Sequence, residues 1–174
     1  MACVIGAPAS GSGKTTLSLL ISAWAYSKGL TIQPFKIGPD YLDSEQLTSV
    51  SKKPCRNLDI ILSGQDWVTR SFHGYGSSSD LVIVEGVMGL FDGIGNTEKG
   101  STAHIAKHLN LPIILVINAK GQAASLGALV EGFRNHDPQL NIAGVVLNNI
   151  NSVRHRNLLR SVLHKLGIDL LGCI

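Results

Sequence analysis

Short apolar runs alternate along this chain with segments of helical periodicity, and this alternation restricts the fold more than any other sequence feature. Most of the runs are rich in Val and Ile, and they cover residues 2–7, 30–35, 80–86, 111–118, 141–148 and 168–174. Runs of this kind suit strands that are buried on both faces, as in a parallel sheet. The 174 residues suffice for one domain with a substantial core.

Segments with the spacing of amphipathic helices lie between most of these runs, at residues 14–28, 101–109, 122–135 and 152–166. Strands that alternate with helices form βαβ units with right-handed crossovers. We therefore predict an α/β fold of three layers, with a mostly parallel central sheet flanked by helices. Residues 74–80 (GYGSSSD) are interpreted as a short polar loop before a strand.

The stretch GAPASGSGKTT at residues 6–16 follows the first predicted strand and opens a helix. Gly11 and Gly13 allow the backbone to turn its N–H groups inward around phosphate oxygens. Lys14 can reach the β- and γ-phosphates, and the Thr15 hydroxyl can ligate Mg²⁺. A phosphate loop of strict spacing would have glycine at position 8, where this chain has Pro8. The loop is therefore interpreted as a variant that is one residue longer. The alternative is a tight strand–helix turn with an incidental lysine.

In this context the loop predicts a P-loop NTPase-like fold that binds ATP with Mg²⁺. The residues predicted to bind the nucleotide are Ser10, Gly11, Ser12, Gly13, Lys14, Thr15 and Thr16. Glu85 ends the apolar run 80–86. A carboxylate there can bind Mg²⁺ beside the phosphates, and the alternative is an acid in solvent at a strand end.

The stretch PFKIGPDYLDSE at residues 34–45 combines Lys36 with several carboxylates. Asp40 and Asp43 are three residues apart and would share a face of a helical turn. Two close carboxylates repel, and a divalent cation relieves the repulsion. For an isolated Asp-x-x-Asp pair, however, capping of a helix N-terminus is the more common role. Lys36 could neutralise a transferring phosphoryl group or a substrate carboxylate.

Two weaker signals come later in the chain. His104 and His108 have the i,i+4 spacing of a zinc pair but no evident third ligand, so a solvated helix face is the preferred interpretation. Asn148 ends an apolar run, where its amide could contact a purine base or cap a turn.

Composition excludes several other classes of protein. The net charge of +3 is scattered and forms no Lys/Arg block, which argues against nucleic acid as a partner. The three cysteines form no CxxC pair, so we expect neither a disulfide framework nor a zinc site. This use of cysteine predicts a cytoplasmic protein. The first residues do not resemble a signal peptide, and the longest apolar stretch is too short to span a bilayer.

The motifs ASGSGKTT, FKIGPDYLD, CRNLD and EGVMGLFDG together resemble the amino-terminal synthetase domain of the cobyrinic acid a,c-diamide synthase family. The resemblance extends over essentially all 174 residues. It implies ATP-dependent amidation of two acetate side chains of a corrin, in cobalamin biosynthesis, through an acyl phosphate that ammonia attacks. Dethiobiotin synthetase is similar in its lengthened phosphate loop.

The resemblance also implies roles for individual residues. Asp40, Asp43 and Glu85 would serve Mg²⁺ and phosphoryl transfer together with Thr15, and Lys36 would face the transferring group. Asn148 would touch adenine, and Tyr41 and Asp92 would lie near the corrin. The expected partners are the corrin, a glutaminase domain or subunit, and a second copy of the chain in a homodimer.

Members of the family carry a carboxyl-terminal glutaminase domain with a cysteine nucleophile. Cys173 ends a predicted strand without a glycine-flanked elbow, and none of Cys3, Cys55 and Cys173 has a credible histidine partner in the sequence. We therefore expect the synthetase domain alone, as a fragment or a split protein. The alternatives are amidation of hydrogenobyrinic acid or nickel-sirohydrochlorin, a dethiobiotin-synthetase-type ligase, a non-catalytic binding fragment, or a partitioning-type ATPase. Ala9 stands where such an ATPase would carry a second loop lysine.

Overall fold

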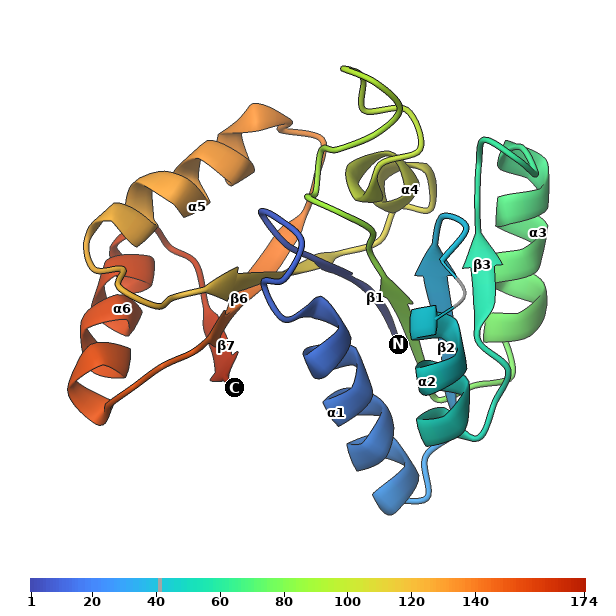
Figure 1. The fold of residues 1–174 in the computed structure, drawn as a ribbon, viewed down its shortest axis with the longest axis horizontal. Helices are drawn as coiled ribbons and strands as arrows, with labels where there is room; N and C mark the ends of the chain where they lie inside the picture. The colour runs from blue at the N-terminus through green and yellow to red at the C-terminus, as the bar shows by residue number, and fades with distance from the viewer. Residues whose placement is uncertain (41) are drawn as a thin grey trace.

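The residues that the computed structural model describes, 1–40 and 42–174, form one sheet of seven strands (Figure 1). The strand order is β3-β2-β4-β1-β5-β6-β7, and every neighbouring pair is parallel. The predicted α/β class is thus confirmed, and the sheet is parallel throughout. The strands are β1 (Ala2–Gly6), β2 (Ile32–Ile37), β3 (Arg56–Leu58), β4 (Leu81–Glu85), β5 (Ile113–Asn118), β6 (Ile142–Asn148) and β7 (Leu170–Cys173).

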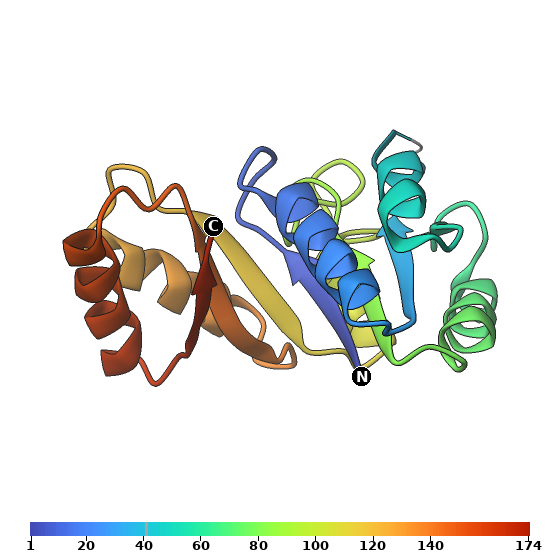
Figure 2. The same ribbon diagram turned by 90° about the horizontal axis from the view of Figure 1, so that it is seen from below.

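Helices cover both faces of the sheet and complete the three layers (Figures 1 and 2). They are α1 (Lys14–Ser27), α2 (Leu42–Ser51), α3 (Gln65–Gly76), α4 (Thr102–His108), α5 (Ser125–His136) and α6 (Val153–Lys165). Helices α1 and α2 pack on one face, and α3 to α6 pack on the other. With right-handed crossovers, the helices change face because the chain first moves from β1 toward β3 and then returns through β4 toward β7.

The core explains why the strand sequences are apolar on both faces. Every residue of β2 is buried, as are four of the five residues of β4. On the α1 side, Ile32 and Ile83 contact Ala25 and Leu47. The opposite face buries a larger cluster that includes Phe35. Polar side chains inside these strands are therefore exceptional, and the two that matter most are Lys36 and Glu85, which are 2% and 0% exposed.

The sequence prediction missed part of the segment between residues 46 and 79. Strand β3 is only three residues long and has one buried position, so it gives almost no periodic signal. Helix α3 buries Val68 and Phe72 at i,i+4 spacing, but glycines at 74 and 76 hide its last turn. The predicted loop at residues 74–80 is therefore wrong for residues 74–76, which form the last turn of α3. Gly76 is buried there, and a Cβ on it would lie 3.3 Å from Val82 Cγ2.

The parallel arrangement brings the carboxyl ends of β1, β2 and β4 to the same edge of the sheet. These neighbouring strands lie where the connections reverse direction, which is the position at which α/β sheets form ligand crevices. The loops that follow them carry the phosphate-loop motif, the Asp40–Asp43 pair and the residues after Glu85. Among the described residues, no helix has the length and apolar character needed to cross a membrane.

Candidate active site

The phosphate loop connects β1 to α1 and turns through two glycines in left-handed conformation. Gly11 has φ 74° and Gly13 has φ 112°, and a Cβ on Gly13 would lie 2.5 Å from Nδ2 of Asn148. No side chain of residues 1–40 or 42–174 caps the start of α1, so the first backbone N–H groups of this 14-residue helix are open to a ligand. A loop of this form directs N–H donors and the helix dipole at one point, which suits a polyphosphate.

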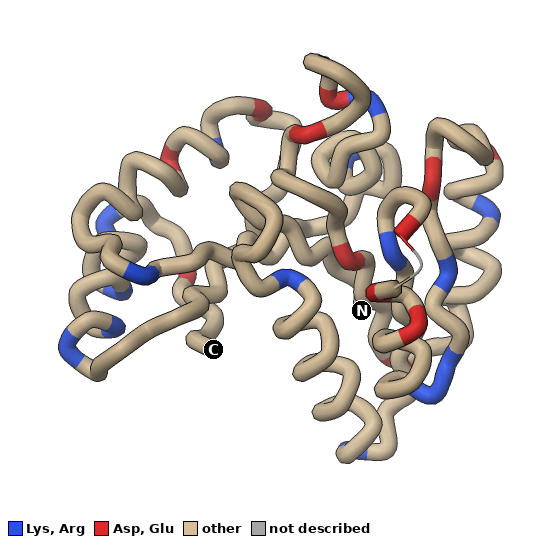
Figure 3. Tube along the Cα trace, viewed as in Figure 1, with Lys and Arg blue, Asp and Glu red and all other residues tan. Residues whose placement is uncertain are grey.

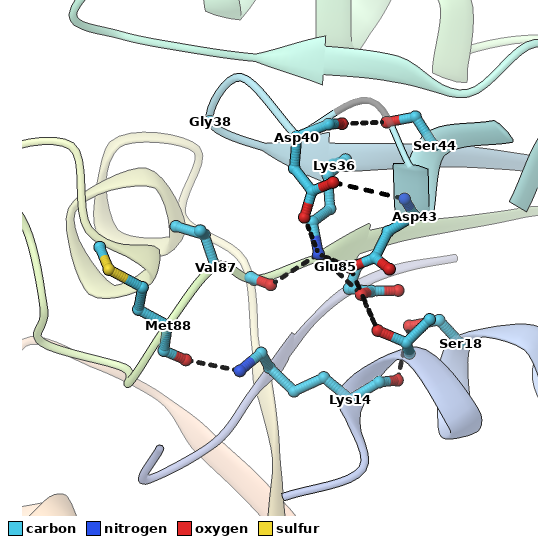
Figure 4. A network of polar contacts seen from close by, with 12 residues as sticks. Lys14, Ser18, Lys36, Gly38, Asp40, Asp43, Ser44, Glu85, Val87 and Met88 are labelled. Atoms are coloured by element: carbon cyan, nitrogen blue, oxygen red, sulfur yellow. Dashed lines mark hydrogen bonds and ion pairs between the residues drawn. The ribbon is translucent and has the colours of Figure 1, made fainter. Parts of the chain in front are cut away.

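Lys14 is the first residue of α1 and extends across the loop. Its Nζ donates to the carbonyl oxygen of Met88, 2.5 Å away, in the loop after β4 (Figure 4). Burial lowers the pKa of Lys14, and the positive charge of Lys36 lowers it further. The negative charges of Glu85 and Asp43 offset part of this decrease. Met88 has φ 47°, unusual for a residue with a side chain, and this turn directs its carbonyl at the lysine.

Lys36 lies at the centre of a group of carboxylates. Its Nζ is 2.7 Å from Asp43 Oδ2, 2.8 Å from Glu85 Oε1 and 3.5 Å from Asp40 Oδ2. It also donates to the carbonyl oxygen of Gly86 at 3.3 Å. Lys36 and Glu85 are direct partners in the β2–β4 register, so the sheet itself brings them together. We call Lys36, Asp40, Asp43 and Glu85 the Lys36 cluster.

The charges of the Lys36 cluster stabilise one another. Burial alone would lower the pKa of Lys36, but the Glu85 charge and the hydrogen bonds with Asp43 and Glu85 outweigh it and raise that pKa. For Asp43, burial would raise the pKa, but the hydrogen bond and charge of Lys36 outweigh it and lower that pKa. Lys36 is therefore a cation and Asp43 an anion at neutral pH. In Figure 3, acidic and basic positions meet here, whereas α6 carries mainly basic ones.

Thr15 connects the phosphate loop to this cluster. Its Oγ1 donates to Glu85 Oε1 at 2.6 Å and lies 3.3 Å from Asp43 Oδ2. The other carboxylate oxygen of Glu85, Oε2, is buried and has no hydrogen-bond partner among the described residues. An unpaired buried carboxylate oxygen is costly, and a bound cation would satisfy it.

Asp40 combines the two roles that the sequence left open. Its Oδ1 accepts from the backbone N–H of Asp43 at 3.3 Å, so it caps the start of α2. Its Oδ2 faces Lys36 at 3.5 Å. The side chain therefore holds the first turn of α2 and also belongs to the Lys36 cluster, on the same side of the sheet as the phosphate loop.

A cavity of about 490 Å³ opens above these residues. It is lined by most of the residues predicted from the sequence: Ser10, Gly11, Gly13, Lys14, Thr15, Thr16, Lys36, Asp40, Asp43 and Asn148. Glu85 is buried below it, and the Ser12 hydroxyl turns back to the carbonyl oxygen of Ala9. Within the described residues, no three His, Cys, Asp or Glu side chains form a group that could hold a metal alone.

Other predicted residues lie at the margin of the cavity or beyond it. Asn148 lines the cavity, but its Nδ2 donates to the carbonyl oxygen of Ser12 and its Oδ1 accepts from Asn149 N–H. Asp92 does not line it, and its Oδ2 accepts from Gly89 N–H. Tyr41, assigned to the corrin by resemblance, lies outside the described residues.

The histidine pair on α4 is not a solvated face, so that prediction is wrong. Both side chains are half-buried. His104 Nδ1 accepts from Gly100 N–H at 3.0 Å, and His108 Nε2 lies 2.8 Å from Thr69 Oγ1. The two rings thus pack against the preceding loop and α3, which the helical spacing alone does not reveal.

Sequence reasoning missed the residues that fix the loop after β4. Thr102 Oγ1 accepts from Val87 N–H and donates to the Val87 carbonyl oxygen, both at 3.1 Å. Gly86 has no room for a side chain, since a Cβ would lie 2.5 Å from Thr102 Oγ1. These contacts hold Met88 where its carbonyl reaches Lys14. The only signal was the glycine after Glu85, because a left-handed methionine cannot be read from sequence.

A parallel sheet whose first loop wraps a helix N-terminus beginning with lysine defines a P-loop NTPase domain. Solved structures of this class share the fold. The 54 kDa protein of the signal recognition particle from Aeropyrum pernix K1, in complex with GDP, matches with a TM-score of 0.69 and 18% identity, over 99% of this chain and 41% of that one. FtsY from Thermotoga maritima matches with a TM-score of 0.63 and 15% identity, over 98% and 60%.

The chain belongs to the CobQ/CobB/MinD/ParA nucleotide binding domain family, whose model matches residues 3–174. It is 46% identical to the cobyrinate a,c-diamide synthase of Synechococcus sp., over all of this chain and 38% of that protein. It is 43% identical to the hydrogenobyrinate a,c-diamide synthase of Streptomyces coelicolor, over 98% of this chain and 35% of that protein. The chain therefore spans less than two fifths of the length of these relatives.

Proposed function

We propose that this chain is the synthetase part of a cobyrinate a,c-diamide synthase, which uses ATP to activate corrin carboxylates for amidation. The observation that carries the proposal is the Lys36 cluster, because Lys36, Asp40 and Asp43 line the same cavity as the phosphate loop and Glu85 lies directly below it. The names of the relatives, cobyrinate and hydrogenobyrinate a,c-diamide synthase, supply the substrate.

The chemistry requires an activated carboxylate. A carboxylate is a poor electrophile toward ammonia, so transfer of the γ-phosphoryl group of ATP to one of its oxygens creates a leaving group. Ammonia then attacks the carbonyl carbon of the acyl phosphate and releases phosphate. The chain must therefore hold a triphosphate, a metal ion and a carboxylate in one place, and it must stabilise the negative charge of the transferring group.

The phosphate loop supplies the first of these parts. The open N–H groups at the start of α1 and the Lys14 ammonium would bind the β- and γ-phosphates. In the structure, Lys14 is held by the Met88 carbonyl, so its ammonium already lies over the loop. Asn148 braces the loop from below through the Ser12 carbonyl, and its place in the cavity wall is consistent with the predicted contact to adenine.

Thr15 and the acidic side chains fit Mg²⁺. The ion usually takes one or two protein oxygens, with phosphates and water completing its shell, so the lack of a three-ligand group is no obstacle. The Thr15 hydroxyl contacts both Asp43 and Glu85, and these two carboxylates share Lys36. Glu85 Oε2 has no hydrogen-bond partner in the part of the chain that the structure describes. Asp40 is the fourth predicted ligand. Mg²⁺ would neutralise the triphosphate and orient its terminal phosphate.

Lys36 would neutralise the transferring phosphoryl group. It is buried, its pKa is raised, and it therefore stays protonated without solvent. Its present partners are carboxylates that would turn to a metal ion when nucleotide binds, which would release the ammonium toward the reacting oxygens. A fixed cation where charge develops is among the largest contributions a site can make.

Ammonia would come from a glutaminase domain or subunit. Burial raises the pKa of Cys3 and of Cys55 to about 11, which disfavours the thiolate that a glutaminase nucleophile requires. Residues 1–174 are therefore assigned to the synthetase reaction only.

Hydrogenobyrinate is the second candidate substrate, because a relative at 43% identity carries that name. The two acids differ in whether cobalt occupies the ring, and the Lys36 cluster would treat their carboxylates alike.

Amide formation with added ammonium tests the proposal. The chain is incubated with ATP, MgCl₂, cobyrinate and ammonium chloride at alkaline pH, where free ammonia accumulates, and the corrin products are analysed by mass spectrometry. We expect mono- and diamide with matching release of ADP, and no product when glutamine replaces ammonium. ADP release without any amide from cobyrinate or hydrogenobyrinate would refute the proposal, and glutamate released from glutamine would refute the assignment of the ammonia source.

A further inference from the structure

A second cavity, of about 270 Å³, opens beside the phosphate-binding cavity at the same edge of the sheet. Val87 and Met88 line both cavities and separate them. In Figure 4, their side chains extend away from Lys14 and Lys36. The loops after β2 and β3 and the long connection from β4 to α4 form its walls. A ligand in the second cavity would therefore lie directly next to a group held at Lys36.

The walls of the second cavity are apolar and unusually exposed. Leu62 is 75% exposed, Ile94 55%, Met88 44% and Ile61 39%. Single exposed apolar residues are ordinary, but four that line one cavity form a patch, and such patches mark binding surfaces.

The backbone fixes this apolar patch in place. Asp59 Oδ1 accepts from the N–H groups of Ile61 and Leu62, at 2.8 and 3.0 Å, which closes the turn that presents both side chains. Gly100 has φ 80°, and its missing Cβ leaves room for Ile61, whose Cγ1 would lie 3.0 Å from such an atom. On the other side, Ile94 N–H donates to the Lys99 carbonyl oxygen at 3.0 Å. The patch is thus preformed.

Lys99 is an exposed cationic residue in the lining of the second cavity. The ammonium of Lys99, whose residue lines the second cavity, makes no hydrogen bond or ion pair with any described residue. The neighbouring carboxylate of Asp59 uses its Oδ1 to accept from the two backbone N–H groups. The second cavity therefore combines an apolar floor with an available cation, which is complementary to an apolar body that carries a peripheral carboxylate.

We infer that the second cavity seats the ring edge of the macrocyclic substrate and that Lys99 pairs with a substrate carboxylate other than the one being activated. This inference rests on the proposed function, in which the substrate is an apolar macrocycle with several carboxylates. The shared wall of Val87 and Met88 would then set the spacing between the anchored carboxylate and the one at Lys36. Lys99 is a specificity-determining positioning residue in this scheme, because it selects which side chain reaches the phosphoryl group.

Absorbance titrations with cobyrinate and with its fully methyl-esterified form test the role of Lys99. K99M keeps an unbranched side chain that is one atom shorter, and it removes the charge. We expect it to weaken cobyrinate binding roughly fivefold, the factor typical of one exposed ion pair. Binding of the ester and of ATP should not change. The matched control is K28M, since Lys28 is exposed at the opposite end of α1.

A second pair of variants tests the apolar patch. L62S should weaken binding of the acid and of the ester alike, by roughly fivefold, because serine removes apolar area that Leu62 would bury against the bound ring. L20S is the control, because Leu20 is 50% exposed on α1.

Three results would overturn the inference. Lys99 does not pair with a carboxylate if K99M binds cobyrinate as tightly as the parent chain does. The same conclusion follows if K99M loses affinity for the acid and for the ester equally. In both cases the proposed function stands. If L62S binds both forms normally, the patch is not the ring site. If the parent chain binds ATP but neither form of the corrin, the proposed function itself fails as well.

Discussion

Replacement of Lys36 by methionine should strongly destabilise this protein, and Mg²⁺ should partly reverse the effect. Lys36 is 2% exposed, and its ammonium lies within 2.8 Å of carboxylate oxygens on both Asp43 and Glu85. Methionine fills a similar volume but leaves the fully buried carboxylate of Glu85 without its cation. Breaking a buried ion pair by removing one partner costs about 3–5 kcal/mol. That is a large part of the ~5–15 kcal/mol that typically holds a domain together.

Thermal unfolding followed by circular dichroism measures this effect. For a domain of this size, about 3–5 kcal/mol corresponds to a fall in melting temperature of roughly 6–20 °C. The double variant K36M/E85Q should be more stable than K36M, because the amide removes the unpaired charge that the single variant creates. Millimolar MgCl₂ should raise the melting temperature of K36M more than that of K36M/E85Q. K28M is the control and should unfold with the parent chain.

The reasoning would be refuted if K36M unfolded within about 2 °C of the parent chain, a shift of less than ~1 kcal/mol. It would also fail if K36M/E85Q were as unstable as the two single changes added together. Such additivity would mean that Lys36 and Glu85 do not interact, despite the 2.8 Å between Nζ and Oε1.

Three further predictions concern the nucleotide, the acidic residues and one histidine. K14A should weaken ATP binding roughly 10- to 100-fold in titration calorimetry, the loss of one charge-assisted contact, while the chain stays folded. Equal affinity would exclude Lys14 from the phosphate site. D40N and E85Q should each reduce ammonium-dependent amidation about 10²-fold, while N151D, an exposed change outside the cavity, should have no effect. Burial and the nearby charges of His108, Lys107 and Lys99 lower the pKa of His104, so the folded state favours the neutral ring. The contribution of the neutral His104 ring to stability is complete when the pH is above 6.5, the ordinary pKa of histidine. This contribution is lost as the pH falls from 6.5 toward the lower pKa of His104 in the folded state. We compare melting temperatures at pH 7.5 and pH 5.5, roughly one unit either side of that ordinary value. The difference between the two should be smaller in H104Q than in the parent chain, and an equal difference would contradict this role of His104.

Much of the site was predictable because its parts are local or lie at strand ends. The phosphate loop is a contiguous motif, and Lys36 and Glu85 each end an apolar run. Since parallel strands share a carboxyl edge, the meeting of these segments with Thr15 and the Asp40–Asp43 pair followed from the fold class. The structure brings these side chains into contact. Their roles toward ATP and Mg²⁺ stay predictions.

Other features have no local signal. Helix α3 was missed because glycines hide an amphipathic pattern of only two buried apolar positions, and β3 because three residues carry no periodicity. The interactions of His104 and His108 depend on which surface lies next to α4. In each case a neighbour distant in sequence decides the environment.

The sequence by itself determined the alternation of strands and helices, the phosphate loop and the supply of charged residues at strand ends, because each depends on periodicity or on short-range backbone conformation. Only the tertiary structure decided that Lys36 lies opposite Glu85, that Met88 adopts φ 47° and holds Lys14, and that Lys99 borders an apolar cavity. These three depend on strand register and on contacts between loops far apart in the chain. Register and loop contacts are set by the packing of the whole sheet, which no single segment encodes.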